Sequence, residues 1–436
     1  MRAPQLRSLF LAILTVSGLA RAQTPAPPAV TLADAIARAK QYAGQIQSAN
    51  LAVLQAREDS TQVRANRLPT VSAFNQYIYT QGNGTPSGVF VANDGVQVYN
   101  EQAQIHEEVL AFFRKGETHR ALAAEAAARA KVEVAARGLN TTVVQNYFAI
   151  VSAQRKFSNA QTSLREAERF LDITDKQEKA GEAARADVVK AKLQLRQRQR
   201  DLQDAQVAIE KAKIALGVLI FPNFSSEFTV VDDIAGAGIL PPVEEARAKA
   251  SASSPDLKAA RSGVEAAGYD VAVARYGYLP SLGVDVFYGF NANQLTANRI
   301  TDGDMHRNFG LSGQVTLNIP VWNWGATKSK IAQAELRRSQ AQLDLSLTEK
   351  TLQANLAAAL AEGKAAEQQL ESLKSSLDLA VESLRLTLLR YTAGEAIAFE
   401  VVDAQSTVTQ ARNAYDDGQV RYRIAQANLQ LLTGSL

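Results

Sequence analysis

The 436-residue sequence contains no cysteine, only two methionines and only three histidines. The absence of cysteine excludes disulfides, thiolate metal sites and catalysis by cysteine. It also excludes the attachment of a lipid to a lipobox cysteine, so we expect a protein that is not lipidated.

Motifs for catalysis and nucleotide binding are missing as well. The sequence has neither a P-loop nor an HExxH motif. The histidines, His106, His119 and His306, lie far apart, and Met305 is the only methionine besides Met1. We therefore expect no enzymatic activity, no cofactor and no resident metal, and a methionine relay for copper is disfavoured.

The N-terminus is typical of a secretory signal peptide over residues 1–22. Arg2 and Arg7 precede a short apolar run from Leu9 to Leu19, and Ala20-Arg21-Ala22 fits a cleavage site. The alternative, an anchoring helix, is disfavoured because the run is too short to span a membrane. Cleavage leaves Lys and Arg equal in number to Asp and Glu, at 44 each. The net charge of +3 thus comes from the signal peptide, and we do not expect nucleic acid as a partner.

One long stretch without proline dominates the second half of the chain. From Gly325 to Tyr391 it is rich in strong helix formers, with Gly363 as its one interior glycine. A continuous helix of about 66 residues would be roughly 100 Å long at 1.5 Å per residue. Charged side chains interrupt it every few residues, so it cannot cross lipid. It ends at Ala393-Gly394-Glu395, which predicts a turn around a left-handed glycine.

The mature chain contains two copies of one plan. Matching segments follow each other in the same order and at nearly constant spacing. The pairs are Leu68-Pro69-Thr70-Val71 with Leu279-Pro280-Ser281-Leu282, Phe113-Arg114-Lys115-Gly116 with Trp322-Asn323-Trp324-Gly325, and Ala180-Gly181-Glu182 with Ala393-Gly394-Glu395. We therefore divide the chain into a first structural repeat, residues 23–242, and a second structural repeat, residues 243–436.

Both repeats predict the same elements in the same order. The first helix stops at the junction with a strand, marked by Pro69 in one repeat and Pro280 in the other, because proline ends a helix. Two extended segments, a long helix, a turn and a return helix follow. The predicted helices are residues 32–67, 117–179 and 183–217, then 243–278, 326–391 and 396–433, with 218–242 as the linker. Apolar spacing near 3.5 residues predicts coiled-coil packing of these helices.

Two segments of the second repeat alternate between apolar and polar residues, which predicts β-strands. Phe309, Leu311, Val315, Leu317 and Ile319 share one face, and Asn308, Ser312, Gln314, Thr316 and Asn318 share the other. Leu282, Val284, Val286, Tyr288 and Phe290 lie opposite Ser281, Gly283 and Asp285. Segments of about ten residues with this pattern are typical of outer-membrane barrel strands. The aromatics at the strand-to-helix junctions predict an interfacial belt, with core packing as the alternative; they are Phe112, Phe113, Trp322 and Trp324.

The strands of the first repeat are less regular. Phe74 to Tyr79 is aromatic, but Val96 to Val109 contains His106, Glu107 and Glu108. Adjacent residues of a strand point to opposite faces, so the two glutamates cannot both face a lumen. We expect this strand to leave the membrane before residue 106 or to contain a bulge.

Four strands in one chain cannot close a barrel, and an open sheet edge is not viable in lipid. The strands therefore require an oligomer, and three chains would supply twelve. The alternative, a soluble periplasmic coiled-coil scaffold without a channel, accounts for the helices but not for the strands.

In its duplication, Leu-Pro helix ends, aromatic strand exits and Ala-Gly-Glu turns, the sequence resembles the TolC-like outer membrane factors over nearly all of residues 30–436. The resemblance implies a mixed α and β membrane protein of Gram-negative bacteria. Its homotrimer would form a twelve-stranded barrel in outer-membrane lipid, continued into the periplasm by an α-helical coiled-coil barrel. The function implied is an exit duct for a tripartite efflux pump or type I secretion system, with a periplasmic adaptor protein and an inner-membrane transporter as partners.

The resemblance also assigns roles at the periplasmic turns. The Gly181 and Gly394 turns would meet the adaptor, and Glu400 and Asp403, three residues apart on one helix face, would form acidic rings around the narrowest aperture. The alternative for these carboxylates is a solvated helix start favoured by the helix dipole. Tyr391 and Asp187 match the two partners of a bond that locks the closed state. A basic residue that relatives use in this lock is Ala396 here, so we expect the lock to be weaker or differently built.

Overall fold

The structure is a computed structural model that describes residues 28–79, 97–223, 227–234, 240–292, 295–296, 298–301 and 303–435. The predicted signal peptide, residues 1–22, lies outside the described residues. The first repeat contains β1 (Ala29–Val30), α1 (Leu32–Tyr42), α2 (Gly44–Ala65), β2 (Thr70–Tyr79), β3 (Gln97–Leu110), α3 (Phe113–Ala180), α4 (Arg185–Ile220) and β4 (Thr229–Val230). The second contains α5 (Val243–Ser253), α6 (Pro255–Tyr276), β5 (Ser281–Ala292), β6 (Asn298–Thr301), β7 (Asp304–Arg307), β8 (Phe309–Asn318), α7 (Ala326–Thr392) and α8 (Ala398–Thr433).

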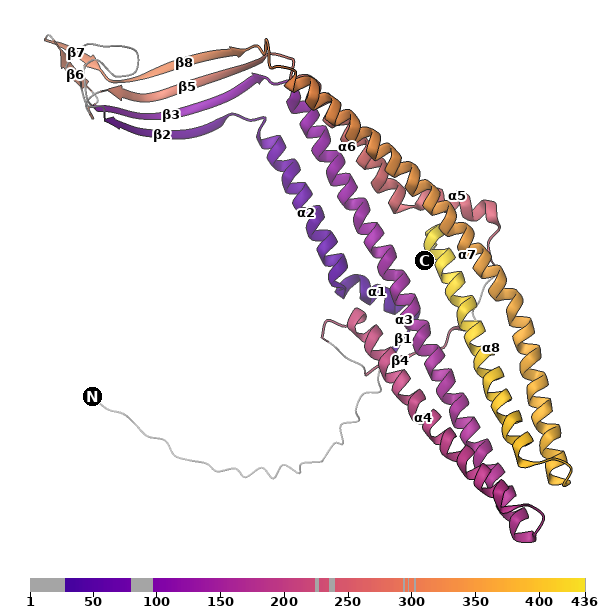
Figure 1. Cartoon of the computed structure of the whole chain (residues 1–436). Coiled ribbons are helices and arrows are strands. Elements are labelled where there is room, and N and C mark those ends of the chain that lie inside the picture. Colours follow the sequence, from indigo (N-terminus) through magenta and orange to yellow (C-terminus); the bar gives the residue numbers. More distant parts are fainter. Residues whose placement is uncertain are drawn as a thin grey trace, which may run out of the picture.

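The molecule is elongated, with a β-sheet at one end and two helical turns at the other (Figure 1). The helices α3 and α7 connect these ends and contain 68 and 67 residues. Each is about 100 Å long at 1.5 Å per residue. The return helices α4 and α8 pack back against them in two antiparallel pairs, α3–α4 and α7–α8. No helix in the described part of the chain has an apolar stretch long enough to cross a lipid bilayer.

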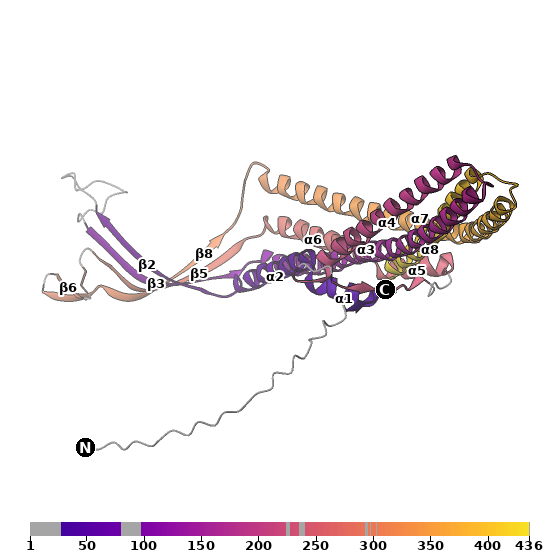
Figure 2. The same ribbon diagram turned by 90° about the horizontal axis from the view of Figure 1, so that it is seen from below.

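Next to the sheet, the helices form a curved layer in the order α2, α3, α6, α7 (Figure 2). The prediction of a continuous helix over 32–67 and over 243–278 is wrong, because each is two helices. Ser254 has an extended backbone with ψ 115°, because a residue that precedes proline avoids the helical conformation. Ala43 is also extended, with ψ 124°, and is followed by Gly44. Both breaks turn a short helix, α1 or α5, onto the middle of the molecule.

The main core lies at mid-length, where α1, α3, α4 and α8 meet the small parallel sheet of β1 and β4. Tyr147 and Phe148 of α3 are its largest buried side chains. The Tyr147 hydroxyl donates a hydrogen bond of 2.7 Å to the carbonyl of Val231, and burial raises the pKa of this phenol to about 12. This core anchors the linker between the repeats to the middle of α3.

The four-stranded sheet is antiparallel throughout, in the order β2-β3-β5-β8. Its register pairs Leu282 with Leu317 and Val284 with Val315, so the apolar faces of β5 and β8 are continuous. Pro69 and Pro280 stand directly before β2 and β5. The two outer strands, β2 and β8, are exposed along their whole length. The sheet therefore has two open edges in a single chain.

The irregular strand β3 contains a register shift between Glu108 and Leu110. The shift lies after the two glutamates, which are paired with Val284 and Gly283 and still alternate between the faces. Arg114 of α3 lies within reach of both carboxylates, at 3.0 Å from Glu107 and 3.6 Å from Glu108. One arginine thus pairs with both acids where the strand passes into the helix.

We expect the close approach of α3 to α6 to limit the side chain at Gly116. A methyl group there would lie 2.8 Å from Val273 Cγ2 and 3.4 Å from Tyr276 Cε2. The valine side chain is stiff, so Gly116→Ala should destabilise the fold by about 1–3 kcal/mol through overpacking. Gly138→Ala in the same helix is the control, since no atom lies within 4 Å, and it should stabilise by about 0.5–1 kcal/mol. Thermal unfolding followed by circular dichroism distinguishes the two, and equal midpoints would contradict the packing assignment.

Candidate functional site: the paired turns at the tip

The two helical turns far from the sheet have the same backbone conformation. Gly181 and Gly394 adopt φ of 79° and 77°, in the left-handed region. The next residue of each turn donates back to the same helix position: Glu182 N–H to Gln177 at 2.8 Å, and Glu395 N–H to Arg390 at 2.8 Å. We call residues 177–187 and 390–400 together the tip. No atom lies within 4 Å of a Cβ at either glycine, so backbone conformation, rather than space, requires glycine there.

The two turns lie side by side and enclose a pocket of about 450 Å³. Its walls come from both repeats, with Gln177, Glu182 and Asp187 on one side and Tyr391, Gly394 and Ile397 on the other. A small apolar cluster lies behind it, which contains Ala398 and Val401 and in which the Phe170 ring contacts the Tyr391 ring. The pocket is therefore a feature of the repeat pair and not of either turn alone.

Tyr391, predicted to be part of the lock, is only 4% exposed. Its hydroxyl donates to Thr174 Oγ1 at 3.2 Å, a partner that sequence reasoning missed. Burial raises the pKa of the phenol, and the negative charge of Asp187 adds to that rise, whereas the bond to Thr174 opposes it. The structure thus places Asp187 near Tyr391. The hydrogen bond from the Tyr391 hydroxyl, however, goes to Thr174 and not to Asp187. A bond between Tyr391 and Asp187 stays a prediction.

Glu400 and Asp403 differ in their surroundings. Arg390 Nη1 lies 3.3 Å from Glu400 Oε2, and Arg390 Nη2 donates to the Glu395 carbonyl at 3.1 Å. Asp403 is exposed and has no ion-pair partner in the part of the chain that the structure describes. Arg390 is therefore a further charged residue at the tip. It lies close to Ala396, the position at which relatives use a basic residue in the lock. Its place in the last turn of a helix, where basic residues are favoured, was the only signal in the sequence.

A second contact at the tip joins the two repeats. The Lys190 ammonium lies 5.2 Å from the centre of the Phe399 ring, a cation–π distance. Lys190 is the first-repeat counterpart of Asp403, nine residues after the turn glycine. The ring of Phe399 and the side chain of Ile397 are otherwise exposed.

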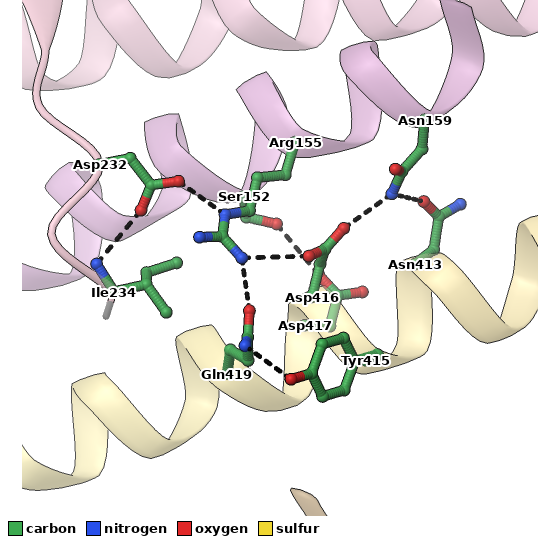
Figure 3. Close-up of polar contacts among 10 residues, drawn as sticks. All are labelled: Ser152, Arg155, Asn159, Asp232, Ile234, Asn413, Tyr415, Asp416, Asp417 and Gln419. Atoms are coloured by element: carbon green, nitrogen blue, oxygen red, sulfur yellow. Dashed lines mark hydrogen bonds and ion pairs between the residues drawn. The ribbon is translucent and has the colours of Figure 1, made fainter. Parts of the chain in front are cut away.

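Above the tip, polar side chains connect α3 to α8, and we call these contacts the α3–α8 seam (Figure 3). Arg155 of α3 binds Asp416 at 3.1 Å and Gln419 on α8, and Asp232 of the linker at 2.7 Å. Closer to the tip, the seam continues through Asn159–Asn413, Ser163–Thr409 and Glu166–Arg412, each at 3.0 Å. Hydrogen bonds and ion pairs therefore connect the two antiparallel helix pairs along this stretch.

Three of the four aromatics at the strand-to-helix junctions lie on the surface, and Phe113 is half-buried. Trp322 and Trp324 are exposed in the connection from β8 to α7, and Phe112 is exposed at the start of α3. Exposure in a single chain disfavours the core alternative for both tryptophans, and their place in an interfacial belt stays a prediction.

The architecture matches that of solved outer-membrane channels. One such structure, of the outer-membrane channel OprN, has a TM-score of 0.79 at 18% identity and aligns over 93% of this chain and 90% of that one. The fold is thus the TolC-like fold of a helical region joined to a β domain.

The sequence places the chain within this class. It matches the model of the protein family described as "Outer membrane efflux protein" over residues 35–220 and 246–435, and the chain belongs to that family. Among its relatives are the outer membrane protein TolC of Vibrio cholerae, at 24% identity over 69% of this chain, and the cobalt-zinc-cadmium resistance protein CzcC of Cupriavidus metallidurans, at 26% over 64%. The aligned regions span 68% and 63% of those two proteins.

The protein is therefore an outer-membrane efflux duct of a family of transport proteins rather than enzymes. The alternative of a soluble scaffold without a channel is not supported.

We expect Arg390 to reduce the negative charge at the predicted aperture. Arg390→Ala frees Glu400, and a surface ion pair is worth about 0.2–1 kcal/mol per chain. A trivalent cation added on the tip side should then block single-channel current at a several-fold lower concentration. Arg385→Ala is the matched control, because Arg385 binds Glu382 on the same helix and does not contact Glu400. Equal changes in both variants would show that net charge, and not the contact with Glu400, determines the block.

Tyr391→Phe removes the donor to Thr174 and keeps the ring against Phe170. The loss of one buried hydrogen bond costs about 0.5–1.5 kcal/mol per chain. We expect higher open probability and conductance in planar bilayers, with cation block retained because both tip carboxylates remain. A variant that conducts like the parent would show that this bond does not stabilise the closed tip.

Proposed function

We propose that three copies of the chain assemble into one duct through the outer membrane and periplasm. The observation that carries the proposal is the pair of open sheet edges, β2 and β8. Unpaired backbone groups along these strands are not viable in lipid. Because β2 and β8 run in opposite directions, β8 of one copy can continue the antiparallel order with β2 of the next. Three copies give twelve strands, an even number within the range of closed barrels.

The helices have matching unpartnered faces. On α7, exposed leucines recur at heptad spacing near the tip, and further leucines are exposed near the sheet. On α4, an exposed face contains Val189, Leu193 and Val207, again at spacings of coiled-coil type. We assign the α7 face of one copy to α4 and α2 of its neighbour, which would close the helical layer into a barrel. The exposed leucines on α7 are Leu336, Leu343, Leu347, Leu379, Leu386 and Leu389.

The tip would then form the periplasmic entrance. Three copies bring six turns of nearly equal conformation together, with Asp403 and the Arg390–Glu400 pair repeated around the axis. Converging carboxylates attract cations and repel anions. The pocket between the paired turns, with exposed Ile397 beside it, suits a docking surface for the tip of an adaptor protein. That adaptor would connect the duct to an inner-membrane transporter, which sets the cargo.

The same assembly assigns the faces of the sheet. The continuous apolar face of β5 and β8 would contact lipid, and the face with Gln314 and Thr316 would line the lumen. Leu317→Arg places a charge in the apolar band at a cost of about 2–4 kcal/mol near the membrane midplane. Thr316→Arg, one residue away, places the same charge in water.

The test is to purify the parent and both arginine variants from outer membranes, and to measure mass by light scattering and conductance in planar bilayers. We expect a three-chain particle that forms channels for the parent and for Thr316→Arg, and a strongly reduced membrane yield for Leu317→Arg. A stable folded monomer would overturn the assembly. Equal yields of the two variants would overturn the assignment of the sheet faces.

A further inference from the structure

One row of polar side chains crosses the whole sheet. Thr70 of β2 is paired with His106 of β3, His106 with Asp285 of β5, and Asp285 with Gln314 of β8. Residues in register on neighbouring strands point to the same face, so the four side chains lie next to one another. We call them the cross-strand row.

The centre of the row is a hydrogen-bonded acid and base. His106 Nδ1 lies 2.7 Å from Asp285 Oδ1, and Gln104 Nε2 donates to the same oxygen at 3.1 Å. Gln104 and His106 are two residues apart on β3, which confirms that both point to the face of Asp285. The imidazole extends over Gly283, where a Cβ would lie 3.5 Å from His106 Cε1.

The charged groups around His106 are few. Thr70 of β2 and Gln314 of β8 are uncharged, and Asp285 is the acid on β5. On β3 itself, Glu108 faces the same side one residue pair away, 3.6 Å from Arg114 of α3. A proton on His106 therefore decides whether the row has a net negative charge or none.

The opposite face of the sheet next to the row is apolar on β5 and β8. Ile105 and Val286 are paired across β3 and β5, and Val284 is paired with Val315 of β8. Glu107 of β3 is also paired with Val284 on this face, and its carboxylate is bound by Arg114 at 3.0 Å. If this apolar face contacts lipid, the row faces the lumen. A barrel of twelve strands, spaced about 4.8 Å apart and tilted about 40°, has a diameter of roughly 25 Å between backbones.

We propose that the cross-strand row is a charge-selective ring inside the barrel, and that protonation of His106 switches its preference for cations. The inference rests on the proposed three-chain barrel. It assigns selectivity to a second place, at the end of the molecule opposite to Glu400 and Asp403. With neutral His106, each chain contributes one uncompensated Asp285 carboxylate, and a ring of carboxylates favours cations. With charged His106, each pair is neutral, and the preference is lost.

The first test measures ion preference in planar bilayers, in a Glu400→Ala, Asp403→Ala background that removes the tip carboxylates. Histidine changes its charge between about pH 5 and 8, and the Debye length at about 0.01 M salt, roughly 30 Å, covers the lumen. From reversal potentials in a KCl gradient, we expect the cation-to-anion permeability ratio to fall by about twofold or more between pH 8 and pH 5.5. His106→Gln should keep the high ratio at both pH values. Asp285→Asn should already have the low ratio at pH 8 and should fall further at pH 5.5, because protonated His106 then has no acid to compensate it. The same fall in His106→Gln as in its background would overturn the proposal.

The second test places the face directly and uses the absence of cysteine from the chain. Ile105→Cys and His106→Cys are neighbours on opposite faces of β3, and both side chains are accessible in a single chain. An anionic, membrane-impermeant thiol reagent should react with the cysteine at 106 and raise cation preference, and should leave the cysteine at 105 unmodified. Reaction at 105, or none at 106, would overturn the lumen placement.

The outcomes separate the two levels of the argument. A parent protein that is a monomer, or that forms no channel, overturns the barrel and the row together. Three-chain channels in which His106→Gln titrates like its background overturn the row and leave the duct intact. Equal amounts of parent and variant trimer in the outer membrane serve as the folding control.

Discussion

The hydrogen-bonding capacity of two sheet edges constrains the whole molecule. Every N–H and C=O group along the free sides of β2 and β8 needs a partner, and lipid offers none. In the described part of the chain the main sheet has four strands, and in the proposed assembly a second copy supplies the partners. The helices follow the same rule, because α2, α4 and α7 stand at the sides of a curved layer and expose apolar residues there. In the proposed assembly the monomer is thus one sector of a closed wall.

Duplication supplies the frame of the tip, and the few differences between the repeats supply its chemistry. The turn glycines occupy equivalent positions in the two repeats, and the backbone hydrogen bonds of the two turns are equivalent. The second repeat has Arg390 paired with Glu400, whereas the first has Gln177 and Asp187 at the corresponding positions. The charged residues of the two kinds of turn therefore alternate around a proposed threefold axis, although all six turns have nearly the same backbone conformation.

The sequence predicted the long and return helices, the strands of the second repeat and both turns, because these depend on local periodicity and on glycine and proline. It did not predict contacts that depend on how distant segments align. His106 and Asp285 are 179 residues apart in sequence and meet only through the register of β3 and β5. The bond from Tyr391 to Thr174 likewise needs the relative height of α3 and α7. Both helix breaks were missed. At Ser254-Pro255 a proline marks the break, whereas at Ala43 no proline does.

The α3–α8 seam has a thermodynamic consequence. Its contacts are hydrogen bonds and ion pairs, such as Arg155–Asp416 and Glu166–Arg412, and water can replace them when the helices separate. Heat capacity rises on exposure of apolar surface and falls on exposure of polar surface. Any motion that moves α8 away from α3 along this stretch therefore carries only a small heat-capacity change, unlike unfolding of the core around Tyr147. The free-energy difference between joined and separated helices should therefore change almost linearly with temperature. The free energy of unfolding of the whole fold should instead follow a strongly curved temperature profile.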